Sequence, residues 1–575
     1  MSEPIVGIDL GTTNSEVAIV ENGNLVVISD ANNQHMLPSF VGLSLDGELL
    51  VGEAARNQYH VYPERTIKSI KRKMGGTDQV EMAGQLFTPQ EISAMLLRQL
   101  KSNAERYLGK TINKAVITVP AYFNETQRQA TVEAGQIAGL EVVRLINEPT
   151  AAALSYDPKF QGTKRALVCD VGGGTLDISI VNIQDGVVEV LANYGNTQLG
   201  GDDFDEKIIK LINQHINQEI AVDVTQMEES TAIRAKLWRA AIEAKQLLSS
   251  QPFVKIEEEF LLSDNGIPYN LSMELSRDQY EQAIMPYMQA ILDTAQIALK
   301  SADLNIADID EILLVGGATR TPLVSQMLAA ETGLESKGGL HPDLSVVQGA
   351  AIQAAMIAGD SVSAVLVDIT PYSFGTRIIG ELDGMPYPAL FYPVIKRNTP
   401  IPVTRSELFF TAEDRQQYVD LKIYQGEDDN ALNNTLIGEF KIEGLRKVRY
   451  KNPVIVEFSL DRNGLLTIKA TEKETGLSKT ITIQNACPRL DSEQIESAQQ
   501  KLNALAGNVQ TDTDLIEQSK WRHRIDNAKQ HASENDIKTI ESLLKIIETA
   551  EIEQDEKQLA QTTEKLENIL SYLET

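Results

Sequence analysis

Three glycine turns in the chain combine residue types that can bind a phosphorylated ligand. Residues 9–13 and 170–175 each contain an aspartate, at least one glycine and a threonine, and each follows an apolar run. A third turn, at residues 316–320, follows the apolar run 311–314. Glycine lets backbone amides approach phosphate oxygens, threonine adds hydroxyl donors, and a carboxylate can hold hydrated Mg²⁺. One such turn is usually structural, but three at strand ends predict a site for phosphates, Mg²⁺ and a nucleoside.

Other chemical motifs are missing or incomplete. Residues 109–111 resemble the end of a P-loop, but Ala104 stands where its first glycine should be. The sequence has no G-x-G-x-x-G after a strand, no H-E-x-x-H and no G-x-S-x-G. Its two cysteines, Cys169 and Cys487, can form neither a disulfide framework nor a metal cluster. Cys169 lies in an apolar run, which predicts a buried thiol.

Alternating strand-like and helix-like patterns must position these turns. Residues 5–10 and 115–119 are typical of buried strands, and residues 90–108 and 124–138 of helices. This alternation predicts an α/β architecture with mixed sheets over residues 1–360.

An internal duplication relates the first two turns. Each is followed by two apolar runs that an Asn-Gly or Asp-Gly pair separates, at 22–23 and at 185–186. Such pairs between apolar runs are a strong hairpin signal. Two copies of strand, glycine turn and hairpin predict two related lobes that face a cleft.

The pattern changes near residue 360. The short apolar run 364–367 is, by itself, an ordinary strand. Residues 371–488 contain period-two runs and the turn Asn463-Gly464, which predict an antiparallel β domain. Residues 491–575 have one glycine and no proline, which predicts a helical bundle or hairpin. Its helically spaced apolar residues are Ile537, Ile540, Leu544, Ile547, Leu559, Leu566 and Leu570.

Composition limits the possible partners and locations. The 575 residues predict three or four domains. A net charge of -29 disfavours nucleic acid and anionic membrane surfaces as partners. The first residues do not resemble a signal peptide, and there is no run of about 18 apolar residues. With two cysteines, these features predict a cytoplasmic protein.

Four longer segments carry a specific resemblance. They are residues 7–15, 119–123, 146–153 and 199–205, and they occur in family order. The chain resembles the heat-shock protein 70 family of chaperones (DnaK type) over residues 5 to about 488, and it is most similar to the HscC-like bacterial branch. The resemblance implies an actin-like ATPase domain with duplicated ribonuclease-H-like lobes (1–360), a linker (361–370), a β-sandwich peptide-binding domain (371–488) and a short helical lid (489–575).

The resemblance also implies roles for residues of the cleft. Lys71 and Glu148 would orient the attacking water, and Lys71 would stabilise transition-state charge. Asp9 and Asp177, with Asp170 nearby, would organise Mg²⁺, and K⁺ is a further candidate ion. Phosphate contacts would come from Gly11, Thr12, Thr13, Asn14, Gly173, Gly174 and Thr175. ATP or ADP would also meet Gly200, Gly201, Lys245, Ser249, Gly316, Gly317, Arg320 and Asp343.

Two positions depart from the family pattern. Ile242 stands where the family commonly has a glutamate, three residues before Lys245, which predicts altered adenosine contacts. Ile379 stands where the family commonly has a methionine in the arch over the peptide, which predicts a changed peptide preference. The last 85 or so residues are also shorter than the usual lid, which predicts faster peptide exchange.

The same resemblance implies a coupled cycle of peptide binding. Extended hydrophobic segments of client or unfolded proteins would bind in a pocket of Ile379, Phe409, Ala412, Val419, Leu421 and Leu465. ATP binding would loosen this pocket through the linker residues Val365, Leu366, Val367 and Asp368 and the relay residues Pro120 and Arg128. Arg144, Asn147 and Asp368 match positions that engage J-domain co-chaperones, and a nucleotide exchange factor is a second expected partner.

Three other functions share parts of this pattern. A small-molecule kinase on an actin-like fold would explain the glycine turns but not the β domain. The 215-residue C-terminal extension argues against an actin-like filament protein. Lys71, Glu148 and Thr175 argue against a non-hydrolysing exchange factor.

Overall fold

The structure is a computed structural model of the 575-residue chain. It describes residues 3–156, 162–227, 230–264, 267–336, 341–360, 365–449, 451–482 and 490–505, together with 539–540, 542–543, 545–546, 562 and 565–566. The chain divides into two compact units. One comprises residues 1–100 and 113–507, and the other comprises residues 101–112 and 508–575.

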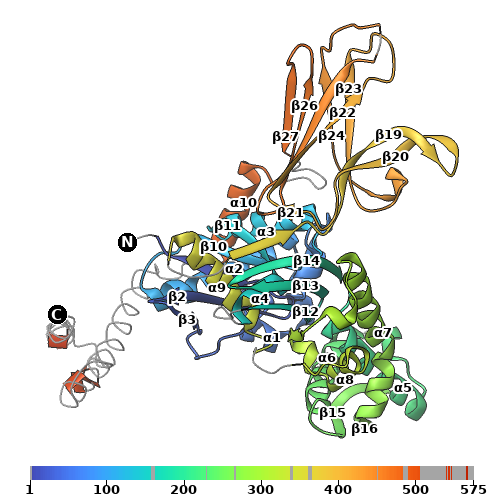
Figure 1. The fold of residues 1–575 in the computed structure, drawn as a ribbon. Coiled ribbons are helices and arrows are strands. Elements are labelled where there is room, and N and C mark those ends of the chain that lie inside the picture. Colours follow the sequence, from blue (N-terminus) through green and yellow to red (C-terminus); the bar gives the residue numbers. More distant parts are fainter. Residues whose placement is uncertain are drawn as a thin grey trace. The chain divides into compact units, whose positions relative to one another are not determined.

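The first glycine turn joins two strands of a six-stranded mixed sheet (Figure 1). Strand β1 lies in the middle of the sheet, where it pairs in parallel with β10 and antiparallel with β2, and the glycine turn follows its carboxyl end. The path runs β11-β10-β1-β2-β3, with β4 beside β2. Its strands are β1 (Ile5–Asp9), β2 (Asn14–Glu21), β3 (Asn24–Val27), β4 (Leu37–Pro38), β10 (Lys114–Val119) and β11 (Glu141–Asn147).

A second mixed sheet repeats this arrangement around the second turn. Strand β12 pairs in parallel with β17 and antiparallel with β13, and the order is β17-β12-β13-β14-β18-β21. In both copies the predicted hairpin turn has positive φ at both residues, Asn22-Gly23 and Asp185-Gly186, as a tight hairpin requires. The strands are β12 (Thr163–Val171), β13 (Leu176–Gln184), β14 (Val187–Asn196), β17 (Glu311–Val315), β18 (Val365–Ile369) and β21 (Pro400–Ile401).

Helices and short sheets surround the two mixed sheets. Helix α3 begins at a complete capping box, in which Asn124 accepts a hydrogen bond from the backbone of Gln127. The helices are α1 (Glu53–Tyr59), α2 (Pro89–Leu108), α3 (Glu125–Ile137), α4 (Glu148–Tyr156), α5 (Gly201–Ile220), α6 (Ser230–Leu248), α7 (Arg277–Ser301), α8 (Pro322–Thr332) and α9 (Ser345–Ala358). The small sheets contain β5 (Phe40–Leu43), β6 (Leu49–Val51), β7 (Thr66–Lys68), β8 (Val80–Met82), β9 (Gln85–Phe87), β15 (Phe253–Asp264) and β16 (Ile267–Ser276).

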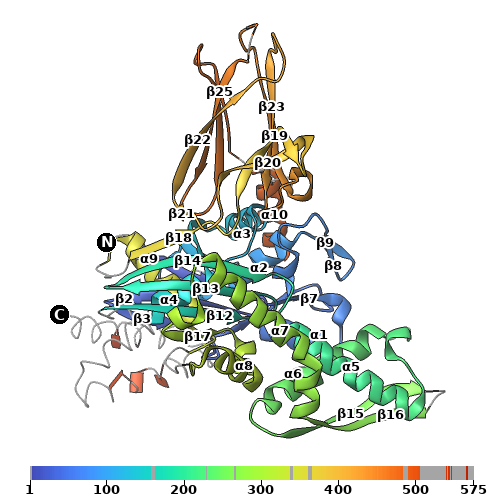
Figure 2. The same cartoon turned by 45° about the vertical axis from the view of Figure 1, so that its right-hand side comes forward.

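Residues beyond 370 form the two antiparallel sheets that the period-two pattern predicts. The sheets, β20-β19-β23-β24 and β22-β25-β26-β27, share one apolar core around Phe458 and Ile468. Figure 2 shows them as two groups of long strands. Their bounds are β19 (Phe374–Leu382), β20 (Met385–Ile395), β22 (Val403–Phe410), β23 (Tyr418–Gln425), β24 (Thr435–Glu443), β25 (Pro453–Leu460), β26 (Leu466–Glu472) and β27 (Ser478–Thr482).

The predicted C-terminal helical region is described only in part. Its first helix is α10 (Ser492–Leu505), which packs on α3. Ile540 and Leu566 are buried helical residues, whereas Ile537, Leu544, Ile547, Leu559 and Leu570 lie outside the described residues, as does Cys487. Cys169 is fully buried, as predicted. Among the described helices, none is long and apolar enough to cross a membrane.

Candidate active site

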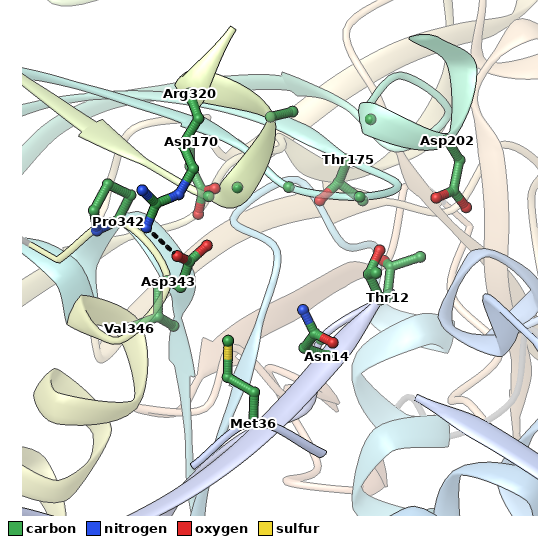
Figure 3. Close-up of a pocket in the computed structure, with 18 of the residues that line it drawn as sticks. Thr12, Asn14, Met36, Asp170, Thr175, Asp202, Arg320, Pro342, Asp343 and Val346 are labelled. Atoms are coloured by element: carbon green, nitrogen blue, oxygen red, sulfur yellow. Dashed lines mark hydrogen bonds and ion pairs between the residues drawn. The ribbon is translucent and has the colours of Figure 1, made fainter. Parts of the chain in front are cut away.

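All three glycine turns border one cavity of about 390 Å³. Figure 3 shows side chains from β1–β2, β12–β13 and the Gly316 turn pointing into this space. The volume falls in the range of pockets that hold small ligands, roughly 300–1,000 Å³. The predicted residues that line it are Asp9, Gly11, Thr12, Thr13, Asn14, Lys71, Glu148, Asp170, Gly173, Thr175, Gly201, Lys245, Ser249, Gly316, Gly317, Arg320 and Asp343.

One end of the cavity holds a buried ion pair. The Lys71 ammonium donates to a Glu148 carboxylate oxygen, and both side chains are almost inaccessible. Lys71 lies in a short 3₁₀ helix, Ile70–Lys73, and Glu148 begins α4 directly after β11. Asp9 accepts a hydrogen bond of 2.6 Å from the Thr118 hydroxyl. Asp9 and Glu148 both act on the Lys71 ammonium, so the end of β1 and the start of α4 lie close together in the cleft.

This end contains more buried carboxyl groups than cations. Burial raises the pKa of Asp9 and Glu148, and the pKa values of Glu16 and Asp170 lie well above their ordinary value for the same reason. Burial alone would lower the pKa of Lys71, but the attraction of Glu148 and Asp9 outweighs it and raises that pKa. Lys71 is thus a permanent cation here. The carboxyl excess favours an additional cation.

The opposite end of the cavity contains cations that already have partners. The Lys245 ammonium lies 2.7 Å from Asp205 and donates to the Gly201 carbonyl at 3.1 Å. Arg320 pairs with Asp343 at 2.5 Å (dashed line in Figure 3). Ile242 lines this wall without a polar group. The geometry suits a neutral, flat or hydroxylated group better than a second anion.

Two glycines show why these turns tolerate no side chain. A Cβ atom on Gly173 would lie 1.8 Å from the Thr13 hydroxyl of the facing turn. Gly316 has φ of 80°, and a Cβ atom there would lie 2.4 Å from the Val171 carbonyl. The turns approach one another closely, and the buried Thr13 hydroxyl has no hydrogen-bond partner among the described residues. That hydroxyl is free for an acceptor such as a phosphate oxygen.

Three predicted residues lie just behind the cavity wall. Asp177 is opposite Asp170 in the β12–β13 register, and its carboxylate accepts the Tyr122 amide at 3.1 Å. Gly174 is packed against Thr12, and Gly200 packs on the glycine turn. In the described ranges, no three carboxylate, histidine or cysteine side chains converge as a set of direct metal ligands.

Sequence reasoning missed Glu16 and Met36, which also line the cavity. Glu16 pairs with Asp9 across β1 and β2, so a carboxylate on the second strand faces the first aspartate. The predicted strand-turn-strand could have revealed it by register. Met36 carries no comparable signal, because its place depends on a long loop.

A network of buried polar groups connects α3 and the end of β11 to the predicted linker. Arg128 donates to Asn147 at 2.6 Å, and Asn147 donates to Asp368 at 2.8 Å. Arg128 also donates to the carbonyls of residues 121 and 123, directly after Pro120. Burial raises the pKa of Asp368, which Arg128 and Arg144 oppose. Arg144, Asn147 and Asp368, the predicted co-chaperone contacts, thus lie together, mostly buried in this network.

The predicted linker contains strand β18, which lies between β14 and β21 in the second mixed sheet. In β18, Val365, Leu366 and Val367 pair in parallel with the start of β14, and Asp368 pairs with β21. The apolar run is therefore a strand, as its composition predicts. It physically connects the hairpin that follows the second glycine turn to the C-terminal β sheets.

Glu125 lies where residues 371–488 contact residues 1–360, and we expect this contact to depend on pH. The side chain is 4% exposed, faces Arg128, Asp461 and the Leu466 amide, and has one carboxyl oxygen without a partner among the described residues. Burial raises its pKa from 4.5 to about 8. The ionised carboxylate is disfavoured when residues 371–488 are docked on residues 1–360. Docking of these two regions should therefore be strongest below about pH 5. It should weaken up to tenfold per pH unit as pH rises towards 8.

Fluorescence energy transfer between one label in residues 1–360 and one in residues 371–488, measured from pH 5.5 to 8.5, tests this dependence. Asp461 and Asp368 add negative charge near Glu125, while Arg128, Arg144 and Arg462 add positive charge. The Glu125→Gln variant should lose the pH slope and remain docked at pH 8. An unchanged slope in that variant would assign the effect to another group.

The predicted peptide pocket is only partly assembled. Phe409 and Val419 pack against the shared β core, Leu421 belongs to that core, and Phe409 meets Tyr392 edge to face at 5.7 Å. Ile379 is 72% exposed and Ala412 is exposed.

Leu465 does not join this group. It closes the β25–β26 turn next to the Val403 end of β22, whereas Phe409 is six residues along β22. At about 3.3 Å per residue, some 20 Å separate the two positions along the strands. The same turn contacts Leu145 through Asn463. Leu465 thus lies at the interface with the linker network.

The comparison with known families agrees with this geometry. The model of the Hsp70 protein family matches residues 5–78 and 76–575, nearly the whole chain. The match does not separate branches of the family, so the similarity to the HscC-like branch stays a prediction. Members of this family are ATP-dependent chaperones, which accounts for a phosphate-type cleft joined to a separate β region. The chain therefore belongs to the Hsp70 family.

Proposed function

We propose that this chain hydrolyses ATP in the cleft of residues 1–360 and thereby switches the affinity of residues 371–488 for extended hydrophobic segments of client proteins. One observation carries the coupling: β18 pairs with both β14 and β21. The hairpin β13–β14 begins directly after Thr175, so a rearrangement at the second glycine turn can reach the linker through this hairpin and its strand pairing with β18. In this proposal residues 361–370 are the linker and residues 489–575 the short lid.

The catalytic roles follow from what each group can donate or accept. The glycine turns supply amides to the phosphates, and the free Thr13 hydroxyl adds a donor. Glu148 accepts a proton or orients water, and Lys71 places a cation where negative charge builds up. Thr175 lines the same end of the cavity.

The carboxyl-rich end fits Mg²⁺ bound mainly through water and phosphate oxygens. Asp9, Asp170 and Asp177 are too dispersed to form a direct cage, but Mg²⁺ commonly retains several waters. When bound, the ion would neutralise phosphate charge. A cation bound there would also offset the charge of the buried carboxyls that, among the described residues, face Lys71. K⁺ remains a further candidate at the same end.

The β region offers a gap for an extended chain. Strand β19 pairs with β23 only over Phe374–Thr376, and in the described residues nothing pairs with the facing edges beyond that point. An inserted peptide could satisfy those backbone groups, and apolar side chains could reach Val419 and Phe409. Ile379, exposed on β19, would close over the peptide.

Val419→Asp tests the peptide assignment. A buried carboxylate beside the peptide should weaken binding of a Leu-rich peptide at least tenfold, while basal ATP hydrolysis stays within twofold. Fluorescence anisotropy with a labelled peptide measures the first and a phosphate-release assay the second. Leu465→Ala is the matched control, because it lies far from Val419, and should leave peptide affinity in the ADP state unchanged. Equal losses in both variants would contradict the assignment.

J-domain proteins and an exchange factor are the proposed partners beside clients. The first would approach Arg144, Asn147 and Asp368, although burial in this arrangement leaves little of them accessible. A cytoplasmic location is proposed from composition. The rival kinase function is weaker, because no sugar-type acceptor explains strand β18 or the β sheets.

Single-turnover hydrolysis of ATP tests the whole proposal. We expect slow basal turnover that a hydrophobic extended peptide and a J-domain protein both accelerate. Hydrolysis that responds to neither would separate the cleft from residues 371–488 and favour the kinase or filament functions. ATP turnover that requires a sugar would identify the kinase.

A further inference from the structure

Four cations occupy one turn of the β region, between β24 and β25. Arg446, Lys447, Arg449 and Lys451 fall within six residues, and all four are exposed. Arg446 lies 4.0 Å from Glu474, whereas among the described residues no acid pairs with the other three. Such a cluster stands out in a chain whose net charge is -29. Residues 444–452 are called the basic turn below.

A buried carboxylate holds both ends of the basic turn in place. Glu472 is fully buried, and it accepts hydrogen bonds from the Arg446 amide at 2.8 Å and from the Asn452 side chain. The Thr475 hydroxyl donates to its other oxygen. Leu445, at the start of the turn, is buried in the shared β core. The backbone that carries the four cations is therefore anchored at both ends, and the cations themselves face solvent.

The basic turn runs beside residues 411–417, the turn between β22 and β23. At one end the Thr411 amide donates to the Asn452 carbonyl at 3.1 Å. At the other end the Leu445 amide donates to the Gln417 carbonyl at 3.0 Å. The neighbouring turn contains one residue of the proposed peptide pocket and leads directly into another, on β23. The basic turn thus borders the pocket without forming part of it.

A peptide that adds to the edge of β23 left free by β19 passes this end of the sheet. In the β23–β24 register Tyr418 faces Glu443, so β23 begins level with the end of β24, where the basic turn starts. An extended chain advances about 3.3 Å per residue, so residues two to four places beyond an anchor at Val419 lie roughly 7–13 Å further along. Those flanking residues, and not the apolar core of the peptide, would meet the basic turn.

The neighbouring turns leave this end of the β sheets with an excess of cations. Arg415 and Lys473 add two exposed cations to the four of the basic turn. Glu443 is paired with Lys441 at 2.6 Å. The acids that oppose these six cations on the same turns are Glu413, Asp414, Glu474 and the buried Glu472. The chain as a whole would repel an acidic peptide, whereas this end of the sheets would attract one.

We propose that the basic turn selects client segments in which acidic residues flank the hydrophobic core. The inference rests on the proposed function, because it assumes that the gap beside β23 holds an extended peptide. Client carboxylates would approach Lys447, Arg449 and Lys451, the cations that no acid of the described residues already pairs. Complementary charge at the rim of a binding site contributes to specificity more than to affinity. The apolar pocket anchors the segment, and the basic turn selects its flank.

Three labelled peptides, titrated by fluorescence anisotropy into the full-length chain with ADP, test this selection. They share one leucine core and carry three Glu, three Gln or three Lys residues on each side. At about 50 mM salt the Glu-flanked peptide should bind at least tenfold more tightly than the Lys-flanked peptide. At about 500 mM salt the ratio should fall below threefold, because salt screens exposed charges. Equal affinities at low salt, or tighter binding of the Lys-flanked peptide, would overturn the proposal.

A double variant assigns the selection to the basic turn. Lys447→Ala with Arg449→Ala should weaken binding of the Glu-flanked peptide at least fivefold and leave the Gln-flanked peptide within twofold of the wild type. Arg405→Ala with Lys469→Ala is the matched control, because it removes the same charge from exposed positions in the middle of β22 and β26. It should bind all three peptides as the wild type does.

The outcomes separate this inference from the function on which it rests. Equal weakening of the Glu-flanked peptide in both double variants would overturn selection by the basic turn. Wild-type protein that binds all three peptides equally would overturn it as well, while leaving the peptide pocket intact. Wild-type protein that binds none of the three would instead overturn the proposed function.

Discussion

Replacing Lys71 by alanine should lower the single-turnover rate of ATP hydrolysis by about 100–1,000-fold, the cost of removing one preorganised charge from a buried site. Among the described residues, Lys71 is the cation that acts on both Asp9 and Glu148. Without it those carboxyls would face the phosphates unopposed, and their pKa values would rise further. Affinity for ATP should change much less, because the three glycine turns and the opposite end of the cavity remain.

Thr175→Ala should act in the same direction, because it removes a hydroxyl from the phosphate end. Lys73→Ala is the matched control: it is an exposed lysine on the same 3₁₀ helix and should hydrolyse ATP at the wild-type rate. Rapid-quench kinetics measure hydrolysis, and equilibrium titration with labelled ATP measures binding. Wild-type hydrolysis by either Lys71→Ala or Thr175→Ala would show that the catalytic assignment is wrong.

Replacing Asp368 by alanine should uncouple the cleft of residues 1–360 from residues 371–488. Asp368 is 6% exposed and accepts hydrogen bonds from Asn147 and from the Ile369 amide. Its loss leaves Arg128 and Arg144 buried without their shared acid, and breaking such an arrangement typically costs about 3–5 kcal/mol. The docked arrangement should therefore become at least a hundredfold less populated.

The readout is the rate at which a labelled peptide dissociates, with ATP and with ADP, in the absence of any J-domain protein. In the wild type, ATP should accelerate dissociation strongly; in Asp368→Ala the two rates should converge, while basal hydrolysis persists. Asp360→Ala, an exposed acid just before the linker, should behave like the wild type. Full ATP acceleration in Asp368→Ala would remove this network from the coupling path.

Local sequence signals predicted the parts of the fold that local geometry determines. The Asn22-Gly23 and Asp185-Gly186 hairpins and the glycine turns lie where the pattern placed them, because backbone conformation and strand alternation are short-range properties. The antiparallel β region also follows its period-two pattern.

Long-range packing explains what the pattern could not predict. Nothing in the sequence around Lys71 distinguishes it from a surface lysine, because its partner Glu148 lies 77 residues away along the chain. Only the family resemblance indicated it. The family resemblance groups Leu465 with Phe409, but strand register places Leu465 at the other end of the β sheets.

The two mixed sheets match over four strands, β10-β1-β2-β3 in the first and β17-β12-β13-β14 in the second, and differ on either side of them. Beyond β14 the second sheet continues with β18, whereas beyond β3 the first sheet has no further strand among the described residues. A chain that doubled one ancestral unit would inherit two matching edges, and only the later copy would have captured the segment that follows it. If residues 361–370 act as the proposed switch, that switch is an asymmetry acquired after duplication. A linker strand grafted beside β3 would test whether the first copy can still respond to one.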